Sequence, residues 1–243
     1  MHPQINASSR DTSVKAEGMS LSPAHVGVLR DRKEAGERLA AQLAHYRDQH
    51  PVVLALPRGG VTVGYEIART LGVPLEVLIV RKIGAPDNPE YGLGALVEDG
   101  TRVIDERRVR EAGYTLKDLE PTISHELAEI RRRARAYRGD RPMPDLHDRV
   151  VILVDDGVAT GGTLRAAIRS VRAHHARRIV VALGVSPQDT FHRLSEEVDE
   201  VVVLAVPELF FAVGEWYHRF PQVSDEEVQL LLERDRRPIA PAA

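Results

Sequence analysis

Several kinds of residue are missing or scarce in this chain of 243 residues. Cysteine is absent, which excludes disulfide bonds, thiolate metal sites and cysteine nucleophiles. Aromatic residues make up only 5% of the chain, with a single tryptophan. No apolar run is long enough to span a bilayer, and the first residues lack the apolar segment of a secretory signal. We therefore expect a cytoplasmic protein with no membrane partner.

Two further absences argue against particular classes of function. The net charge is −3, so the chain has no overall excess of positive charge, which argues against nucleic acid as a partner. The Gly-Lys-Ser/Thr of a P-loop and the glycine fingerprint of a dinucleotide-binding fold are both missing. The length allows one large domain or two small ones.

The most informative stretch follows an unbroken apolar run, Val150 to Val154. A β-branched run of this kind predicts a strand buried on both faces of a parallel sheet. Two carboxylates come next, Asp155 and Asp156, and then a small-residue turn that leads into a helical pattern. The unpaired N–H groups at a helix start suit a phosphate, and carboxylates suit sugar hydroxyls. The stretch therefore favours a ligand that carries both groups.

The sequence from the apolar run through Ala-Thr-Gly-Gly-Thr resembles the 5-phosphoribosyl-1-pyrophosphate (PRPP) loop of the type I phosphoribosyltransferases. The resemblance implies that Asp155 and Asp156 hold the ribose hydroxyls and contact Mg²⁺ mostly through the substrate. It implies that the 5′-phosphate is bound by Ala159, Thr160, Gly161, Gly162 and Thr163. The simpler interpretation is a glycine-rich turn without a ligand, because motif matches include false positives.

A second loop follows the predicted strand Val52 to Leu56. It contains Arg58, Gly59 and Gly60, and a helix with apolar residues four apart comes after it. Gly and Pro also favour plain connecting turns. In the resembled family the loop after this strand binds pyrophosphate, which implies that Arg58 and the two glycines do so here.

A third loop follows a predicted strand from Leu75 to Val80. It opens with Arg81 and Lys82 and ends in Glu90-Tyr91-Gly92. Adenine-type members of the family have a similar opening and ending. The resemblance implies that Arg81 and Lys82 bind PRPP, that Lys82 neutralises the pyrophosphate, and that Glu90 lies near the leaving group or the attacking base. The alternative is a charged hairpin in solvent.

The region from 207 to 236 is the most aromatic part of the chain. Type I enzymes cover the acceptor base with a small hood, so we expect a hood here, with Phe211, Trp216 and Tyr217 as stacking candidates. Core packing explains these aromatic residues equally well. The family's 6-oxopurine enzymes have an aspartate where this chain has Ala159, which weakens hypoxanthine or guanine as the acceptor.

Strands alternate with helices along most of the chain, which predicts an α/β fold with a Rossmann-like parallel sheet. Ligands bind beyond the carboxyl ends of such strands, and all three loops lie at those ends. We expect a flexible leader (1–26), a phosphoribosyltransferase core (27–206), the hood (207–236) and a loose tail (237–243). A hairpin over 94–104 and a long helix through 123–137 fall within the core. The arginine run of that helix, residues 131–135, is expected to face solvent, with a dimer contact or a nucleic-acid patch as the alternatives.

The predicted function is transfer of phosphoribose from PRPP to a small nitrogenous acceptor, with Mg²⁺ as cofactor and a homodimer as the assembly. Two alternatives stay open. One is a module that binds PRPP for regulation without turnover. The other is a hydrolase or phosphatase that uses the same phosphate loop.

Overall fold

The computed structural model describes residues 27–236, so the predicted leader and tail lie outside the described part of the chain. Five parallel strands form the central sheet in the order β2-β1-β6-β7-β8. Their bounds are β1 Val52–Ala55, β2 Leu75–Val77, β6 Val150–Asp155, β7 Arg178–Val185 and β8 Glu200–Ala205. The predicted α/β fold with a mostly parallel sheet is confirmed.

Helices cover both faces of this sheet. One face packs against α1 (Arg32–Gln42) and α2 (Gly59–Leu71), and the other against α5 (Gly162–Ala173) and α6 (Gln188–Glu197). Alternate strand residues serve the two faces: Ile152 belongs to the first core and Leu153 to the second. This double burial explains why the central strands are continuously apolar. Among residues 27–236, no helix combines the length and apolarity that a bilayer span requires.

A second, antiparallel sheet was not expected as a separate unit. It contains β3 (Val80–Gly84), β4 (Gly92–Val97) and β5 (Arg102–Ile104). The predicted strand from Leu75 to Val80 is confirmed only over Leu75–Val77, and its predicted end is wrong because the chain leaves the parallel sheet after Val77. The next two amides bond to Ala55 O and to the Glu98 carboxylate. The predicted hairpin between 94 and 104 is confirmed as β4 and β5.

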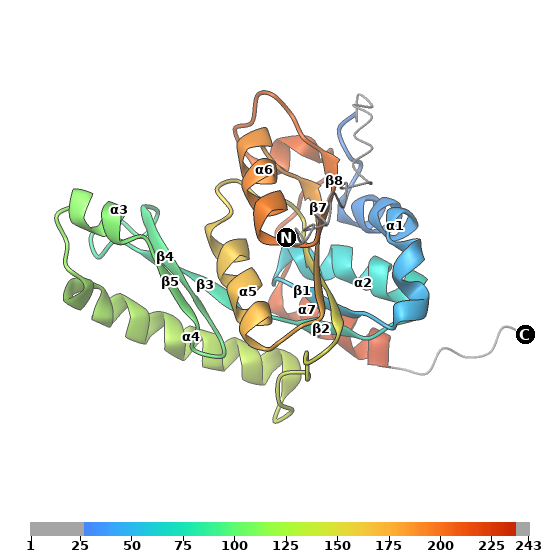
Figure 1. Cartoon of the computed structure of the whole chain (residues 1–243), viewed down its shortest axis with the longest axis horizontal. Helices are drawn as coiled ribbons and strands as arrows, with labels where there is room; N and C mark the ends of the chain where they lie inside the picture. The colour runs from blue at the N-terminus through green and yellow to red at the C-terminus, as the bar shows by residue number, and fades with distance from the viewer. Residues whose placement is uncertain (1–26, 237–243) are drawn as a thin grey trace, which may run out of the picture.

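We call residues 80–111, which comprise this sheet and α3 (Glu106–Glu111), the arm. Figure 1 shows the arm beside the main sheet, with the long α4 (Glu120–Arg138) running along it. Arg138 donates to both Glu98 oxygens at 2.8 and 2.9 Å and to Val77 O at 3.0 Å. Ser170 on α5 donates to Asp99 in the hairpin turn at 2.6 Å. These contacts fix the root and the turn of the arm against the core.

The remaining helical elements complete the surface. They are the short helices η1 (Ala44–Gln49), η2 (Leu116–Leu119) and η3 (Val213–Trp216), and the last helix α7 (Asp225–Arg236). Arg131 and Arg135 on α4 are exposed, as expected for a solvated face. Arg132 and Arg133 instead pair with Glu129, and Arg132 also pairs with Asp225 at 2.9 Å. Part of the arginine run therefore joins α4 to α7.

Candidate active site

The loops after β1 and β6 meet because these strands are neighbours in register, with Ala55 opposite Val154. The contact leaves no room for a side chain at Gly59 or Gly60. A Cβ added at Gly60 would lie 2.7 Å from Val154 O, and one added at Gly59 would collide with the Asp156 carboxylate. The glycines of the predicted pyrophosphate loop thus press directly against the predicted ribose-binding acids.

Asp155 and Asp156 have different environments although they are adjacent. The Asp156 carboxylate pairs with Arg32 on α1, with 2.6 Å between Oδ2 and Nε. Asp155 forms no ion pair within residues 27–236, and its Oδ1 accepts from the Asp156 N–H at 2.9 Å. Asp155 is therefore the acid that is more available to a ligand.

Arg32 is itself held by the C-terminal region. Its NH1 donates to Pro221 O at 2.7 Å, and its guanidinium lies 3.7 Å from the centroid of the Phe220 ring. Arg32 and Asp156 have side chains that are only 9% and 13% exposed. The predicted hood and the first helix therefore meet at the acidic pair, and the sequence analysis missed Arg32 altogether.

Burial raises the pKa of Asp155 well above its ordinary value, and the neighbouring Asp156 charge raises it further. Burial also raises the pKa of Asp156, but the Arg32 guanidinium opposes the shift. The two carboxylates titrate as an interacting pair. Strongly shifted groups often mark functional sites.

The predicted PRPP loop leads into α5 through Gly161, whose φ of 77° lies in the left-handed region that favours glycine. Two contacts anchor the loop to neighbouring elements. The Val158 N–H donates to Val185 O at 3.0 Å, and the Thr190 hydroxyl donates to Ala159 O at 2.8 Å. The first N–H groups of α5 are thereby presented at a fixed helix start, which suits an anion.

Arg58 lies at the start of α2, and its side chain turns toward α7. Its NH1 is 3.7 Å from Asp225 Oδ1. Asp225 also accepts from the Tyr137 hydroxyl at 2.6 Å. The backbone of the predicted pyrophosphate loop thus lies beside the two acids, while the Arg58 guanidinium is near the Asp225 carboxylate.

Lys82 and Arg81 alternate along β3 and have different partners. Lys82 Nζ donates to Glu90 Oε2 at 3.0 Å and to Glu90 O at 3.2 Å. Arg81 pairs instead with Glu126 on α4, at 2.6 Å. The structure thus joins the two ends of the predicted loop through Lys82 and Glu90, whereas Arg81 is engaged by α4.

A cavity of about 780 Å³ lies between the arm and the predicted PRPP loop. Lys82 and Glu90 line it from the arm, and Thr160, Gly162 and Thr163 line it from the start of α5. Arg58, Arg81, Asp155 and Asp156 are not among its lining residues. The cavity thus brings together two of the three predicted loops.

The hood candidates have separate environments. Phe211 is 80% exposed in the loop after β8. Trp216 is half-buried, and its backbone carbonyl accepts from the Leu29 N–H at 2.9 Å. These two residues stay stacking candidates, although neither lines the cavity.

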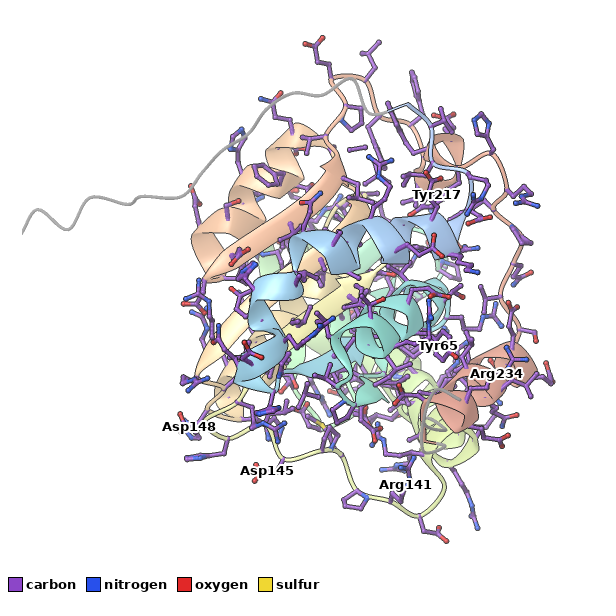
Figure 2. The ribbon with its side chains drawn as sticks, turned by 90° about the vertical axis from the view of Figure 1, so that its right-hand side faces the viewer. Tyr65, Arg141, Asp145, Asp148, Tyr217 and Arg234 are labelled. Atoms are coloured by element: carbon purple, nitrogen blue, oxygen red, sulfur yellow. The ribbon has the colours of Figure 1, made fainter. Side chains whose placement is uncertain are left out.

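Tyr217 is 5% exposed and stacks on Phe220, so its ring offers little surface to a base. Its hydroxyl donates to Asp156 O at 2.5 Å. Burial raises its pKa, which keeps the hydroxyl protonated as a donor. A Cβ at Gly184 would collide with this hydroxyl. Tyr217 lies beside one end of α1 (Figure 2) and pairs with Leu29. Its hydrogen bond to the Asp156 carbonyl oxygen stabilises the acidic turn.

The chain is similar to known proteins in sequence and in fold. A family profile described as a phosphoribosyl transferase domain matches residues 28–202. Proteins from two strains of Mycobacterium tuberculosis, provisionally named as phosphoribosyl transferases, are 44% identical over 212 residues. The match covers 87% of this chain and 48% of theirs, so the chain spans about half the length of these curated relatives.

A solved structure is also similar. The crystal structure of TT1426 from Thermus thermophilus is 44% identical, with a TM-score of 0.72 over 85% of this chain and 98% of that one. The family profile covers well over half of the chain. The chain therefore belongs to the phosphoribosyl transferase family.

Proposed function

We propose that this protein transfers the phosphoribosyl group of PRPP to a nitrogen nucleophile, a nucleobase or a similar ring, and releases pyrophosphate. The observation that carries the proposal is the meeting of the glycine loop after β1 with the acidic turn after β6, next to the anion-binding start of α5. These features match the parts of one ligand: a pyrophosphate, a ribose and a 5′-phosphate.

In this proposal Asp155 accepts hydrogen bonds from the ribose hydroxyls, and Ala159 to Thr163 bind the 5′-phosphate through backbone N–H groups. Arg58, the adjacent glycines and Lys82 bind the pyrophosphate. The reaction breaks the bond between the anomeric carbon and the pyrophosphate and forms a bond to the acceptor nitrogen. Catalysis then depends on positioning and on neutralising the departing charge.

Mg²⁺ would bind at this site together with the phosphates of the substrate. Residues 27–236 contain no group of three or more His, Asp or Glu side chains that could hold a metal. Mg²⁺ is commonly held by one or two carboxylates together with substrate phosphates. Asp155 and Asp156 would supply the carboxylates, and the ion would neutralise phosphate charge. The homodimer, the cytoplasmic location and the role of Glu90 stay predictions.

A pyrophosphate-release assay of the full chain tests the function. PRPP and Mg²⁺ are supplied with a series of nitrogenous bases, and the double variant with Asp155→Asn and Asp156→Asn serves as the blank. Transfer requires pyrophosphate release only when PRPP, Mg²⁺ and a suitable base are all present. A regulatory module would bind PRPP without releasing anything, and a hydrolase would consume PRPP with no base added.

Lys82→Gln should lower the rate of pyrophosphate release by about 10²- to 10³-fold, as expected for one lost charge-stabilising donor. The Lys82–Glu90 pair is exposed, with 93% exposure of Glu90, so the unfolding temperature should change little. Lys117→Gln, an exposed lysine outside the cavity, is the matched control. An unchanged rate in Lys82→Gln would remove the lysine from the reaction.

A further inference from the structure

The Arg58 side chain, which the proposed function assigns to the pyrophosphate, is only loosely held. Its one ion pair within residues 27–236 joins NH1 to Asp225 Oδ1 at 3.7 Å, which is longer than a hydrogen bond. The Arg58 side chain is 29% exposed. A guanidinium has five N–H donors in a planar fork. These donors therefore remain available to an incoming anion.

Asp225, by contrast, is firmly held. It is the first residue of α7, which packs against α2 and α4 (Figure 1). Its Oδ1 accepts from the Tyr137 hydroxyl at 2.6 Å, and its Oδ2 accepts from Arg132 NH2 at 2.9 Å. The hydrogen bonds from Tyr137 and Arg132 lower the pKa of Asp225, so this carboxylate is ionised at neutral pH. Asp225 is thus a fixed anion beside a mobile cation.

This difference between the two partners allows Arg58 to exchange one anion for another. If Arg58 leaves, Asp225 keeps two hydrogen-bond donors, so no unpaired acid is created. A phosphate group can bind a guanidinium through two parallel hydrogen bonds, which is a stronger contact than the one at 3.7 Å. Asp225 lies beyond the region that the family profile matches, so family membership alone does not predict the contact.

We propose that Asp225 sets the affinity for PRPP by competing with its pyrophosphate group for Arg58. This inference rests on the proposed function and adds a residue that tunes substrate binding. In the free protein Asp225 holds the guanidinium beside α7, and the pyrophosphate displaces the carboxylate when PRPP binds. Asp225 does not touch the substrate and acts through Arg58.

Calorimetric titration of the full chain with PRPP and Mg²⁺ tests the competition. Asp225→Asn removes the negative charge, while its amide oxygen can still accept from Tyr137. This variant should bind PRPP about two- to fivefold more tightly than the wild type, as expected when a partly exposed ion pair no longer has to be broken. Ribose 5-phosphate lacks the pyrophosphate, so its affinity should be unchanged.

The gain should depend on Arg58. In an Arg58→Gln background, Asp225→Asn should leave the affinity for PRPP unchanged, a dependence that a merely structural role of Asp225 would not produce. Asp225→Ser is a second neutral variant, with a residue that also suits a helix start, and it should show the same gain. Glu227→Gln is the matched control, because Glu227 is an exposed acid in the same first turn of α7 and forms no ion pair within residues 27–236. It should resemble the wild type.

An Arg58-dependent gain in Asp225→Asn or Asp225→Ser supports the inference. Unchanged or weaker PRPP binding in both variants contradicts it, as does a gain that persists in the Arg58→Gln background or that Glu227→Gln reproduces. In those cases the proposed function stands, because the wild type still binds PRPP. If the wild type does not bind PRPP, the proposed function fails together with the inference.

Discussion

Asp155→Asn should weaken PRPP binding by about 10- to 100-fold and at the same time stabilise the folded protein. The loss follows from replacing a charged acceptor of sugar hydroxyls by a neutral one. The gain follows because burial and the Asp156 charge both disfavour the ionised Asp155 side chain. An increase of about 1 kcal/mol in the free energy of unfolding is typical of such relief, equivalent to about 2–4 °C.

The stability gain of Asp155→Asn should depend on pH. Because the pKa of Asp155 is raised on folding, the native protein holds a proton that the unfolded chain releases as the pH rises above the ordinary value of 3.8. The wild type therefore loses stability as the pH rises through the raised pKa, whereas the variant does not. The unfolding temperatures of Asp155→Asn and the wild type should differ little near pH 4, and the variant's should be clearly higher at pH 8.

The neighbouring variant, Asp156→Asn, is the control for this prediction. It removes the partner of Arg32, so it should destabilise the protein while Asp155→Asn stabilises it. Calorimetric titration with PRPP and Mg²⁺ measures the binding effect of each variant. Equal destabilisation by both substitutions would contradict the distinction between the two acids.

Arg32→Met should destabilise the protein by about 3–5 kcal/mol, which corresponds to a fall in the unfolding temperature on the order of 10 °C. Methionine keeps an apolar stem against Phe220 but leaves the buried Asp156 carboxylate without its cation. The loss of stability in Arg32→Met should become smaller as the pH falls, because protonation of Asp156 removes the unpaired charge. Urea unfolding at pH 5 and pH 8 measures both effects.

Arg30→Met is the matched control for Arg32→Met. Arg30 lies close to Arg32 in the chain and pairs with Asp31, but its side chain is 53% exposed. An exposed pair contributes little to stability, so this variant should resemble the wild type. Similar small effects at both positions would show that the Arg32 pair does not stabilise the acidic turn.

The sequence predicted the parts of the fold whose burial pattern is simple. The run from Val150 to Val154 is buried on both faces and becomes β6. Because β1 and β6 are parallel neighbours, the loops at their carboxyl ends had to meet, as the contact of Gly59 and Gly60 with the acidic turn shows. The same expectation for the third loop is wrong, because Arg81 and Lys82 lie within β3 of the antiparallel sheet. The arm was harder to predict, because the apolar run through Leu78 and Ile79 hides the point where the chain changes sheets.

The site residues that the sequence missed act across long separations. Arg32 and Asp156 are 124 positions apart, and no periodicity in either segment links them. Tyr217 was considered as a stacking surface because the stretch is aromatic, but its environment depends on space that Gly184 leaves on β7.

Gly59 lies against the Asp156 carboxylate and Gly184 against the Asp156 carbonyl oxygen, and both limit which residues this region can accept. A side chain at residue 59 would overlap the carboxylate of residue 156, and one at residue 184 would overlap the phenol oxygen of residue 217. Each glycine is thus tied to a particular larger partner. A relative that has alanine at either place must have a different residue at the partner position or a shifted backbone, so these positions are expected to change in pairs.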